Sequence, residues 1–132
     1  MEVSSLILDL ERKCFDRPWE GLLHDSSCFY VVLLYKRIPI AYVIGRIIPP
    51  EGEILRLGVL KEWRRKGFGR MVMENTLDFL LESGAKRVFL EVSEKNHPAL
   101  NLYRSMGFKE IMYRPSLYSD GSRGIIMYRD LP

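Results

Sequence analysis

The 132-residue sequence has no long hydrophobic run. Its longest apolar stretch, 29–35, has seven residues, whereas a membrane-spanning helix needs roughly 20. The N-terminal segment has an early glutamate and only a short apolar stretch at 6–8. It therefore lacks the basic start and the longer apolar region of a signal peptide. We expect a cytoplasmic protein that does not associate with membranes.

Cysteine and histidine are also scarce. Cys14 and Cys28 are isolated and form no Cys-x-x-Cys pair, which favours free thiols over the alternatives, a disulfide or a metal site. His24 and His97 stand alone, without a cluster of further ligand residues. The sequence therefore predicts no metal site.

The net charge is small, because twenty Lys and Arg stand against seventeen Asp and Glu, which gives +3. Residues 61–70 (KEWRRKGFGR) hold five basic residues and one acidic residue. This local charge of +4 leaves −1 for the rest of the chain. A nucleic-acid-binding protein would present a broad basic face. The distribution favours a small anionic ligand and no nucleic acid.

The length of the chain predicts one domain over residues 1–132, and 47% apolar residues are enough for a core. Helices are predicted at 4–14, 69–83 and 98–106, where apolar residues recur at spacings of three and four, with a short helix near 20–24. Strands are predicted at 29–35, 40–48, 54–60, 87–92, 108–113 and 124–129. The first three strands should form two antiparallel hairpins in series. This order predicts an α/β (α+β) fold, a mixed sheet with helices packed on it.

A basic, glycine-rich loop joins the strand at 54–60 to the helix at 69–83. Residues 64–70 read RRKGFGR. Glycines let the backbone approach an anion, and a helix N-terminus adds about half a positive charge. The motif is neither a Walker loop, since no Lys-Ser or Lys-Thr follows the second glycine, nor a dinucleotide fingerprint, since Val72 stands at the third glycine position. By itself the loop also fits a solvated basic turn.

The second half of the chain carries a more specific pattern. Residues 88–108 read VFLEVSEKNHPALNLYRSMGF. The chain as a whole contains, in order, Cys14-Phe15-x-x-Pro18-Trp19, Leu57-Gly58-Val59, Arg64-x-x-Gly67-x-Gly69, Leu90-Glu91-Val92, Asn96, Leu102-Tyr103 and Gly107-Phe108. These motifs resemble those of the GNAT superfamily of acetyl-CoA-dependent N-acetyltransferases. The likeness is greatest to the RimI-type protein N-terminal acetyltransferases, and it covers nearly the whole chain.

The resemblance implies a GNAT fold with acetyl-CoA as cosubstrate. The loop would bind the pyrophosphate of coenzyme A, and the pantetheine arm would pair with a strand that opens at a bulge. The implied cofactor-binding residues are Leu57, Gly58, Val59, Arg64, Arg65, Lys66, Gly67, Phe68, Gly69, Arg70 and Asn96. Gly58 fits a bulge or a close backbone approach, or is only a weak point in the strand. Asn96 is equally suited to cap the following helix.

Acetyl transfer to an amine requires two proton transfers. The amine must lose a proton to attack, and the leaving thiolate must gain one. The resemblance implies Glu91 as the base, acting through water, and Tyr103 as the acid. Their alternative roles are an ion pair with a nearby arginine and helix packing, respectively. Glu53 and Glu94 are the substitutes for the base.

The acceptor side departs from the family pattern. Phe15, Trp19 and Tyr118 are the candidate substrate contacts, although the first two fit an ordinary core as well. RimI-like chains carry R-x-x-Y-Y where residues 114–118 read RPSLY, and an acidic pair where Arg123 and Gly124 stand. The leading hypothesis is acetylation of a protein N-terminal α-amine, and these departures favour the alternative, a small amine or a lysine side chain.

Two further expectations concern partners. GNAT chains open with a strand before the first helix, and here that strand is absent or very short, so a homodimer would cover the exposed sheet edge. A hypothesis of a different class is a non-enzymatic module that binds RNA or an acidic partner through residues 64–70.

Overall fold

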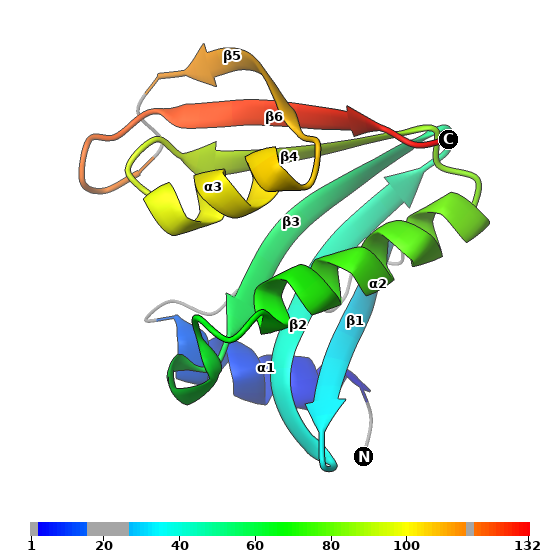
Figure 1. The fold of residues 1–132 in the computed structure, drawn as a ribbon, viewed down its shortest axis with the longest axis vertical. Coiled ribbons are helices and arrows are strands. Elements are labelled where there is room, and N and C mark those ends of the chain that lie inside the picture. Colours follow the sequence, from blue (N-terminus) through cyan, green and yellow to red (C-terminus); the bar gives the residue numbers. More distant parts are fainter. Residues whose placement is uncertain (1–2, 16–26, 116–117) are drawn as a thin grey trace.

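The computed structural model describes residues 3–15, 27–115 and 118–132 (Figure 1). The elements in chain order are α1 (Val3–Cys14), β1 (Cys28–Tyr35), β2 (Ile38–Ile48), β3 (Glu51–Val59), the 3-10 turn η2 (Lys61–Trp63), α2 (Phe68–Glu82), β4 (Arg87–Ser93), α3 (His97–Ser105), β5 (Lys109–Arg114) and β6 (Gly124–Asp130). Every predicted helix and strand within these residues is present, with ends within three residues of the prediction. The helix predicted near 20–24 lies outside the described residues. No helix in the described ranges is both long and apolar enough to cross a membrane.

The six strands form one sheet in the order β1-β2-β3-β4-β6-β5. The strands β1, β2 and β3 form the two predicted hairpins. All neighbours are antiparallel except β3 and β4, which run parallel and are connected by α2. Parallel neighbours require such a crossover. The predicted fold class is confirmed, and the first described element is α1, with β1 as an outer strand of the sheet.

The two faces of the sheet are covered differently (Figure 1). On one face, here called the helix face, α2 and α3 pack over a large apolar core that includes Leu80 of α2 and Val88 of β4. On the other, here called the open face, α1 packs over β1, β2 and β3. There Ile7 and Leu10 contact Tyr42 of β2. In Figure 1, α2 and α3 lie in front of the sheet and α1 lies behind it.

The neighbouring strands β3 and β4 diverge along their length (Figure 1). They pair only from Glu51 to Ile54 of β3. The ladder between β2 and β3 skips Leu55, which marks a bulge at this point, and a bulge bends the strand that carries it. The bulge therefore lies at Leu55 and not at Gly58, the glycine predicted to fit it. Gly58 instead makes room for Tyr42, whose Cε1 would lie 2.3 Å from a Cβ at that position.

Candidate active site

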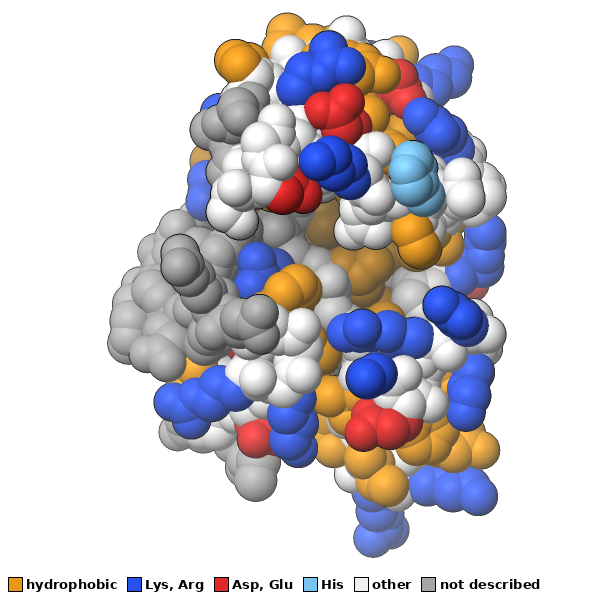
Figure 2. Space-filling view, turned by 90° about the vertical axis from the view of Figure 1, so that its left-hand side faces the viewer, with side chains coloured by type: hydrophobic (Ala, Val, Ile, Leu, Met, Phe, Trp, Pro, Cys, Tyr) orange, Lys and Arg blue, Asp and Glu red, His pale blue; other side chains and the backbone are white. Residues whose placement is uncertain are grey.

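A cleft of about 460 Å³ lies between the diverging parts of β3 and β4. Its lining residues are Phe15, Glu53, Ile54, Leu55, Arg56, Leu57, Leu90, Glu91, Val92, Ser93, Asn96, Ala99, Tyr103 and Tyr118. Figure 2 shows a hollowed surface with hydrophobic side chains at depth and Lys and Arg side chains beside it. The cleft brings together six residues that the sequence predicted for the site, namely Phe15, Leu57, Glu91, Asn96, Tyr103 and Tyr118. Trp19 lies outside the described residues.

Glu91 enters this cleft from the open face. Side chains alternate along a strand, and Leu90 and Val92 on either side are buried in the core of the helix face. The Glu91 side chain is 25% exposed. Arg114 Nη1 donates a hydrogen bond to Glu91 Oε1 at 3.0 Å, and the Tyr118 hydroxyl donates one to Oε2 at 3.5 Å. The ion pair considered as an alternative role is therefore present, and it is formed at the cleft itself.

Tyr103 reaches the same cleft from the helix face. It lies on α3, is 7% exposed and packs edge-to-face against Phe108 with ring centres 6.0 Å apart. Burial raises the pKa of the Tyr103 hydroxyl to about 12, and the nearby Tyr118 adds to this rise. The hydroxyl therefore keeps its proton at neutral pH, which makes it a proton donor. The packing role and the cleft-lining role occur together.

The divergence of the strands explains how these two side chains can share one cleft. A continuous sheet would separate a carboxylate on its open face from a hydroxyl on its helix face. Pairing of β3 with β4 ends at Ile54 and Leu90, one residue before Glu91. The opening therefore lets two reactants approach from opposite faces and meet between a carboxylate and a protonated phenol.

The two substitute bases are placed less favourably than Glu91. Glu94 does not line the cleft; it binds the backbone N–H and the guanidinium of Arg123, which lowers the pKa of the Glu94 carboxyl. Glu53 lies where the strands are still paired and forms an ion pair with Arg46 at 3.9 Å. The hydrogen bonds with Glu94 also fix the side chain of Arg123. The Arg123 guanidinium lies 4.3 Å from the ring centre of Tyr113.

The basic loop follows β3 and leads into α2. Gly67 has φ +87°, a left-handed conformation that glycine adopts without steric cost. The first N–H groups of a helix have no partner within the helix, and no side chain caps α2. The amides from Phe68 to Arg70 therefore point out at the positive end of the helix dipole. This geometry suits a phosphate.

The cationic side chains of the loop make separate contacts. Arg64 Nε donates a hydrogen bond to the carbonyl of Val59 at 2.8 Å. Arg70 binds the hydroxyl of Ser105 on α3, and the Lys66 ammonium lies 5.5 Å from the ring centre of the neighbouring tryptophan. Because these contacts are exposed, the charges can turn toward an anion at little cost.

Asn96 has a structural role and also lines the cleft. Its Oδ1 accepts a hydrogen bond from the N–H of Ala99 at 3.3 Å, which caps α3, and a proline follows in the first turn. Only the side-chain oxygen is used for capping. The amide nitrogen is therefore the part of Asn96 available to a ligand in the cleft.

A buried polar cluster beside the cleft was missed by the sequence reasoning. Glu11 of α1 is 1% exposed. It accepts a hydrogen bond from the Tyr42 hydroxyl, and Arg56 donates to both of its oxygens at 3.0 and 3.3 Å. The Arg56 guanidinium lies 3.5 Å from the ring centre of Phe15. The available signal was a glutamate four residues after Ile7, on the apolar stripe of the predicted helix.

Within the described residues there is no group of three or more His, Cys, Asp and Glu that could hold a metal ion. Cys14 and Cys28 are not joined by a disulfide.

Comparisons with known proteins agree with this geometry. The family model described as "Acetyltransferase (GNAT) family" matches residues 3–108. The chain belongs to the GNAT acetyltransferase family. An N-alpha-acetyltransferase of Sulfurisphaera tokodaii is 35% identical over 121 residues, which cover 82% of this chain and 72% of the relative.

Solved GNAT structures show the same fold. The crystal structure of the ribosomal protein bS18-alanine N-acetyltransferase of Escherichia coli has a TM-score of 0.88 at 26% identity, and covers 98% of this chain and 90% of its own. A Bacillus subtilis acetyltransferase in complex with CoA has a TM-score of 0.83 at 16% identity, over 100% and 95% of the two chains. The predicted family, its RimI-like character and the enzyme class, an N-acetyltransferase, are confirmed by these matches.

Proposed function

We propose that this protein transfers the acetyl group of acetyl-CoA to the N-terminal α-amine of a protein. The observation that carries the proposal is the cleft through the sheet, with Glu91 and Tyr103 on its walls and a basic helix N-terminus following β3. Membership of the GNAT family supports the reaction. The similarity to proteins named N-alpha-acetyltransferase and bS18-alanine N-acetyltransferase supports the acceptor.

Acetyl-CoA binds from the helix face. Its pyrophosphate lies against the amides that open α2, with Arg64, Arg65, Lys66 and Arg70 neutralising further phosphate charge. Its pantetheine arm pairs with the backbone of Leu57–Val59, on the edge of β3 that β4 leaves unpaired. Arg64 releases the carbonyl of Val59 when this happens, and the Asn96 amide contacts the arm from the opposite wall.

The chemistry follows from the two proton-handling groups. The ammonium group of the acceptor loses one proton to Glu91, directly or through one water, and its lone pair then attacks the thioester carbonyl carbon. As the new C–N bond forms and the C–S bond breaks, the sulfur takes the proton of Tyr103, and the second proton of the nitrogen restores the Tyr103 hydroxyl while Glu91 releases the first to solvent. One proton is thus transferred to the thiol and one is released to solvent, which balances the reaction.

The acceptor approaches from the open face, between Phe15 and Tyr118. Trp19 is proposed to complete this side. Arg123 stands where relatives have an acidic pair, but Glu94 neutralises its charge outside the cleft. It therefore does not repel a protonated α-amine, and this supports a peptide acceptor despite the altered sequence.

Acetylation of peptides varied at their first two residues tests the proposal, with free lysine and small amines as competing acceptors. We expect turnover on peptides with a free N-terminus. A matched peptide with a blocked N-terminus and an internal lysine should give none. Turnover on free amines without any on peptides would overturn the acceptor assignment.

A thermal-shift titration separates the enzyme from the alternative of a non-enzymatic binding module. Saturation with acetyl-CoA at 100 times its Kd should stabilise the fold by about 2.7 kcal/mol. An unchanged melting temperature at millimolar acetyl-CoA would remove the cosubstrate from the proposal.

A further inference from the structure

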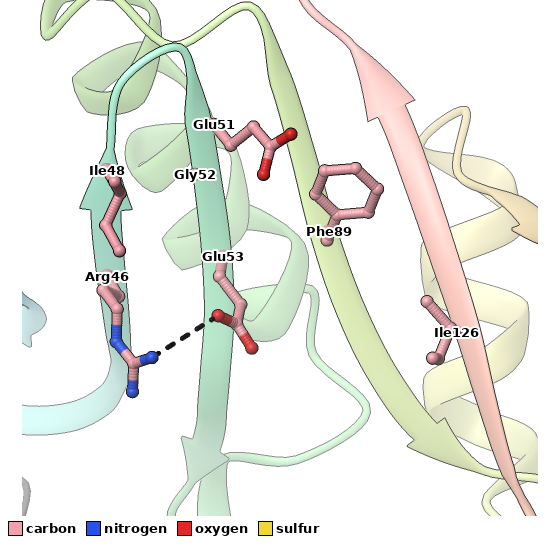
Figure 3. Close-up of a pocket in the computed structure, with 7 residues that line it drawn as sticks. All are labelled: Arg46, Ile48, Glu51, Gly52, Glu53, Phe89 and Ile126. Carbon is pink, nitrogen blue, oxygen red and sulfur yellow. Dashed lines mark ion pairs between the residues drawn. The ribbon is translucent and has the colours of Figure 1, made fainter. Parts of the chain in front are cut away.

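A second hollow of about 340 Å³ lies on the open face next to the cleft. It is lined by Arg46, Ile48, Glu51, Gly52, Glu53, Phe89 and Ile126 (Figure 3). Glu53 lines both the hollow and the cleft. The hollow is therefore a continuation of the cleft along the paired part of β3 and β4.

The spacing along β4 relates this hollow to the acceptor amine. Phe89 and Glu91 lie two residues apart and so share a face of the strand, with about 7 Å between them. An extended polypeptide advances about 3.3–3.6 Å per residue. A chain with its amine at Glu91 that runs along this face reaches Phe89 with its third residue.

The hollow is acidic in one part and apolar in another. The side chain of Glu51 extends from β3 toward the Phe89 ring on β4, whereas Glu53 lies over β3 with one oxygen toward Arg46 (Figure 3). Arg46 is the one cation among the described lining residues, and its contact with Glu53 is long, at 3.9 Å. Glu51 is exposed and forms no ion pair with any described residue.

The cation opposite Glu51 on the neighbouring strand is Arg87, which is attracted by Glu51 but forms its ion pair with another carboxylate. Arg87 pairs with Glu51 in the β3–β4 register, but its Nε binds Asp130 at 2.5 Å. Glu51 therefore keeps a negative charge at the rim of the hollow, above an apolar floor formed by Phe89 and Ile126. A long side chain with an aliphatic stem and a cationic end complements such a surface.

We propose that this hollow binds the third to fifth residues of the acceptor polypeptide and that Glu51 selects lysine or arginine there. The inference rests on the proposed function, since it requires a polypeptide acceptor. The methylene groups of the bound side chain cover Phe89 and Ile126, and its charged end binds the Glu51 carboxylate. Glu51 is thus a specificity-determining residue outside the reacting groups.

Steady-state kinetics on matched peptides test this assignment. The peptides share their first two residues and carry lysine, glutamine or glutamate at the third, fourth or fifth position. At one of these positions we expect kcat/KM to fall in the order lysine, glutamine, glutamate, with about a twofold to fivefold difference between the extremes, as is usual for an exposed ion pair. The difference should shrink as NaCl is raised from about 50 to about 500 mM.

Two variants show whether Glu51 is responsible. Glu51→Gln should bring the ratio of kcat/KM for the lysine and glutamate peptides close to one. Glu82→Gln is the matched control, because Glu82 is exposed at the end of α2, and it should leave the ratio unchanged. Equal kcat/KM values at all three positions, or a preference that survives Glu51→Gln, would overturn the inference but not the proposed function.

Two other outcomes also contradict the inference. Turnover on free amines without any on peptides would remove it together with the proposed function. A dimer in light scattering that Ile48→Asp converts to a monomer would show that this face is an interface between copies, because Ile48 lines the hollow and is exposed.

Discussion

The two faces of the sheet are held by different interactions. The helix face is a continuous apolar core, in which Leu80 of α2 and Val88 of β4 are fully buried. On the open face, the few apolar contacts of α1 are joined by the buried carboxylate of Glu11, bound to Tyr42 and Arg56. Apolar packing stabilises the first face, whereas charged groups fix the geometry of the second.

This difference explains where a reactive site can form. A carboxylate is costly to bury without partners, so a base suits the open face, where Glu91 reaches both solvent and Arg114. A phenol that must stay protonated benefits from burial, which the helix face supplies to Tyr103. The opening between β3 and β4 joins the two environments. Substitutions at the two walls of the cleft should therefore reduce activity, whereas substitutions behind them should reduce stability.

The largest expected effects are on activity, at the two proposed reacting groups. Glu91→Gln and Tyr103→Phe should each lower kcat by about 10²- to 10⁴-fold, the usual contribution of a positioned base or acid. Calorimetric titration should give a Kd for acetyl-CoA within about twofold of the parent, because neither side chain belongs to the phosphate site.

The matched control for this comparison is Glu94→Gln. Glu94 lies three residues after Glu91 and also binds an arginine, but it does not line the cleft. Its substitution should leave kcat at saturating peptide within about twofold of the parent, whereas the KM for the peptide should rise because the charge of Arg123 is no longer neutralised. Full activity of both Glu91→Gln and Tyr103→Phe would refute the catalytic assignment, and a large loss in Glu94→Gln would transfer the base to that residue.

The next effect is on stability and concerns the open face. Glu11→Ala leaves Arg56 and the buried Tyr42 hydroxyl without their carboxylate, so the free energy of unfolding in urea should fall by about 3–5 kcal/mol. The exposed pair of Asp9 and Lys13 on the same helix is the control, and Asp9→Ala should cost less than about 1 kcal/mol. A similar small cost for Glu11→Ala would mean that apolar contacts alone hold α1.

A smaller effect on activity is expected at Gly124 of β6. A Cβ there would lie 2.7 Å from Oε2 of Glu91, and the carboxylate is the flexible end of its side chain, so it can move aside. Gly124→Ala should lower kcat about tenfold to a hundredfold, as expected for a misplaced catalytic group, with an unchanged melting temperature. The control is Gly84→Asn, far along the chain after α2, where no atom lies within 4 Å of the added Cβ; because Gly84 has φ +94°, this change should lower the melting temperature but leave kcat unchanged. If kcat were unchanged in Gly124→Ala, activity would not depend on the exact position of the Glu91 carboxylate.

The sequence predicted those features that depend on neighbours along the chain. A short run rich in apolar residues at 87–92 predicted β4 and helical periodicity predicted α2, both within one residue of their observed ends. It did not predict the cluster of Glu11 with Tyr42 and Arg56, because these contacts join residues 31 and 45 positions apart. The withdrawal of Arg123 from the cleft likewise depends on Glu94, 29 positions away.

The position of the cleft was predictable only through the family resemblance. A glycine inside a strand is a local sign of irregular pairing, and this sign pointed to Gly58. The bulge at Leu55 has no such sign in the sequence, because the register of two strands decides it. The family resemblance thus proposed Glu91 and Tyr103 as the reacting groups, whereas long-range pairing decides which faces of the sheet they reach.

The smallest expected effect is the alkaline pH dependence that follows from burial on the helix face. Tyr103 has a pKa of about 12 in the folded protein and near 10 when unfolded. The stability linked to its proton is fully present below about pH 10 and is lost as the pH rises toward about 12. Between about pH 10 and pH 11, the melting temperature of Tyr103→Phe should therefore fall less than that of the parent. Tyr42 and Tyr118 also have raised pKa values, and they contribute the same decline to both proteins. Because the acid stays protonated, kcat should not fall between about pH 8 and pH 10. If the melting temperatures of the parent and of Tyr103→Phe fell equally with rising pH, the Tyr103 hydroxyl would not be desolvated in the fold. The contrast between the two faces would then not include Tyr103.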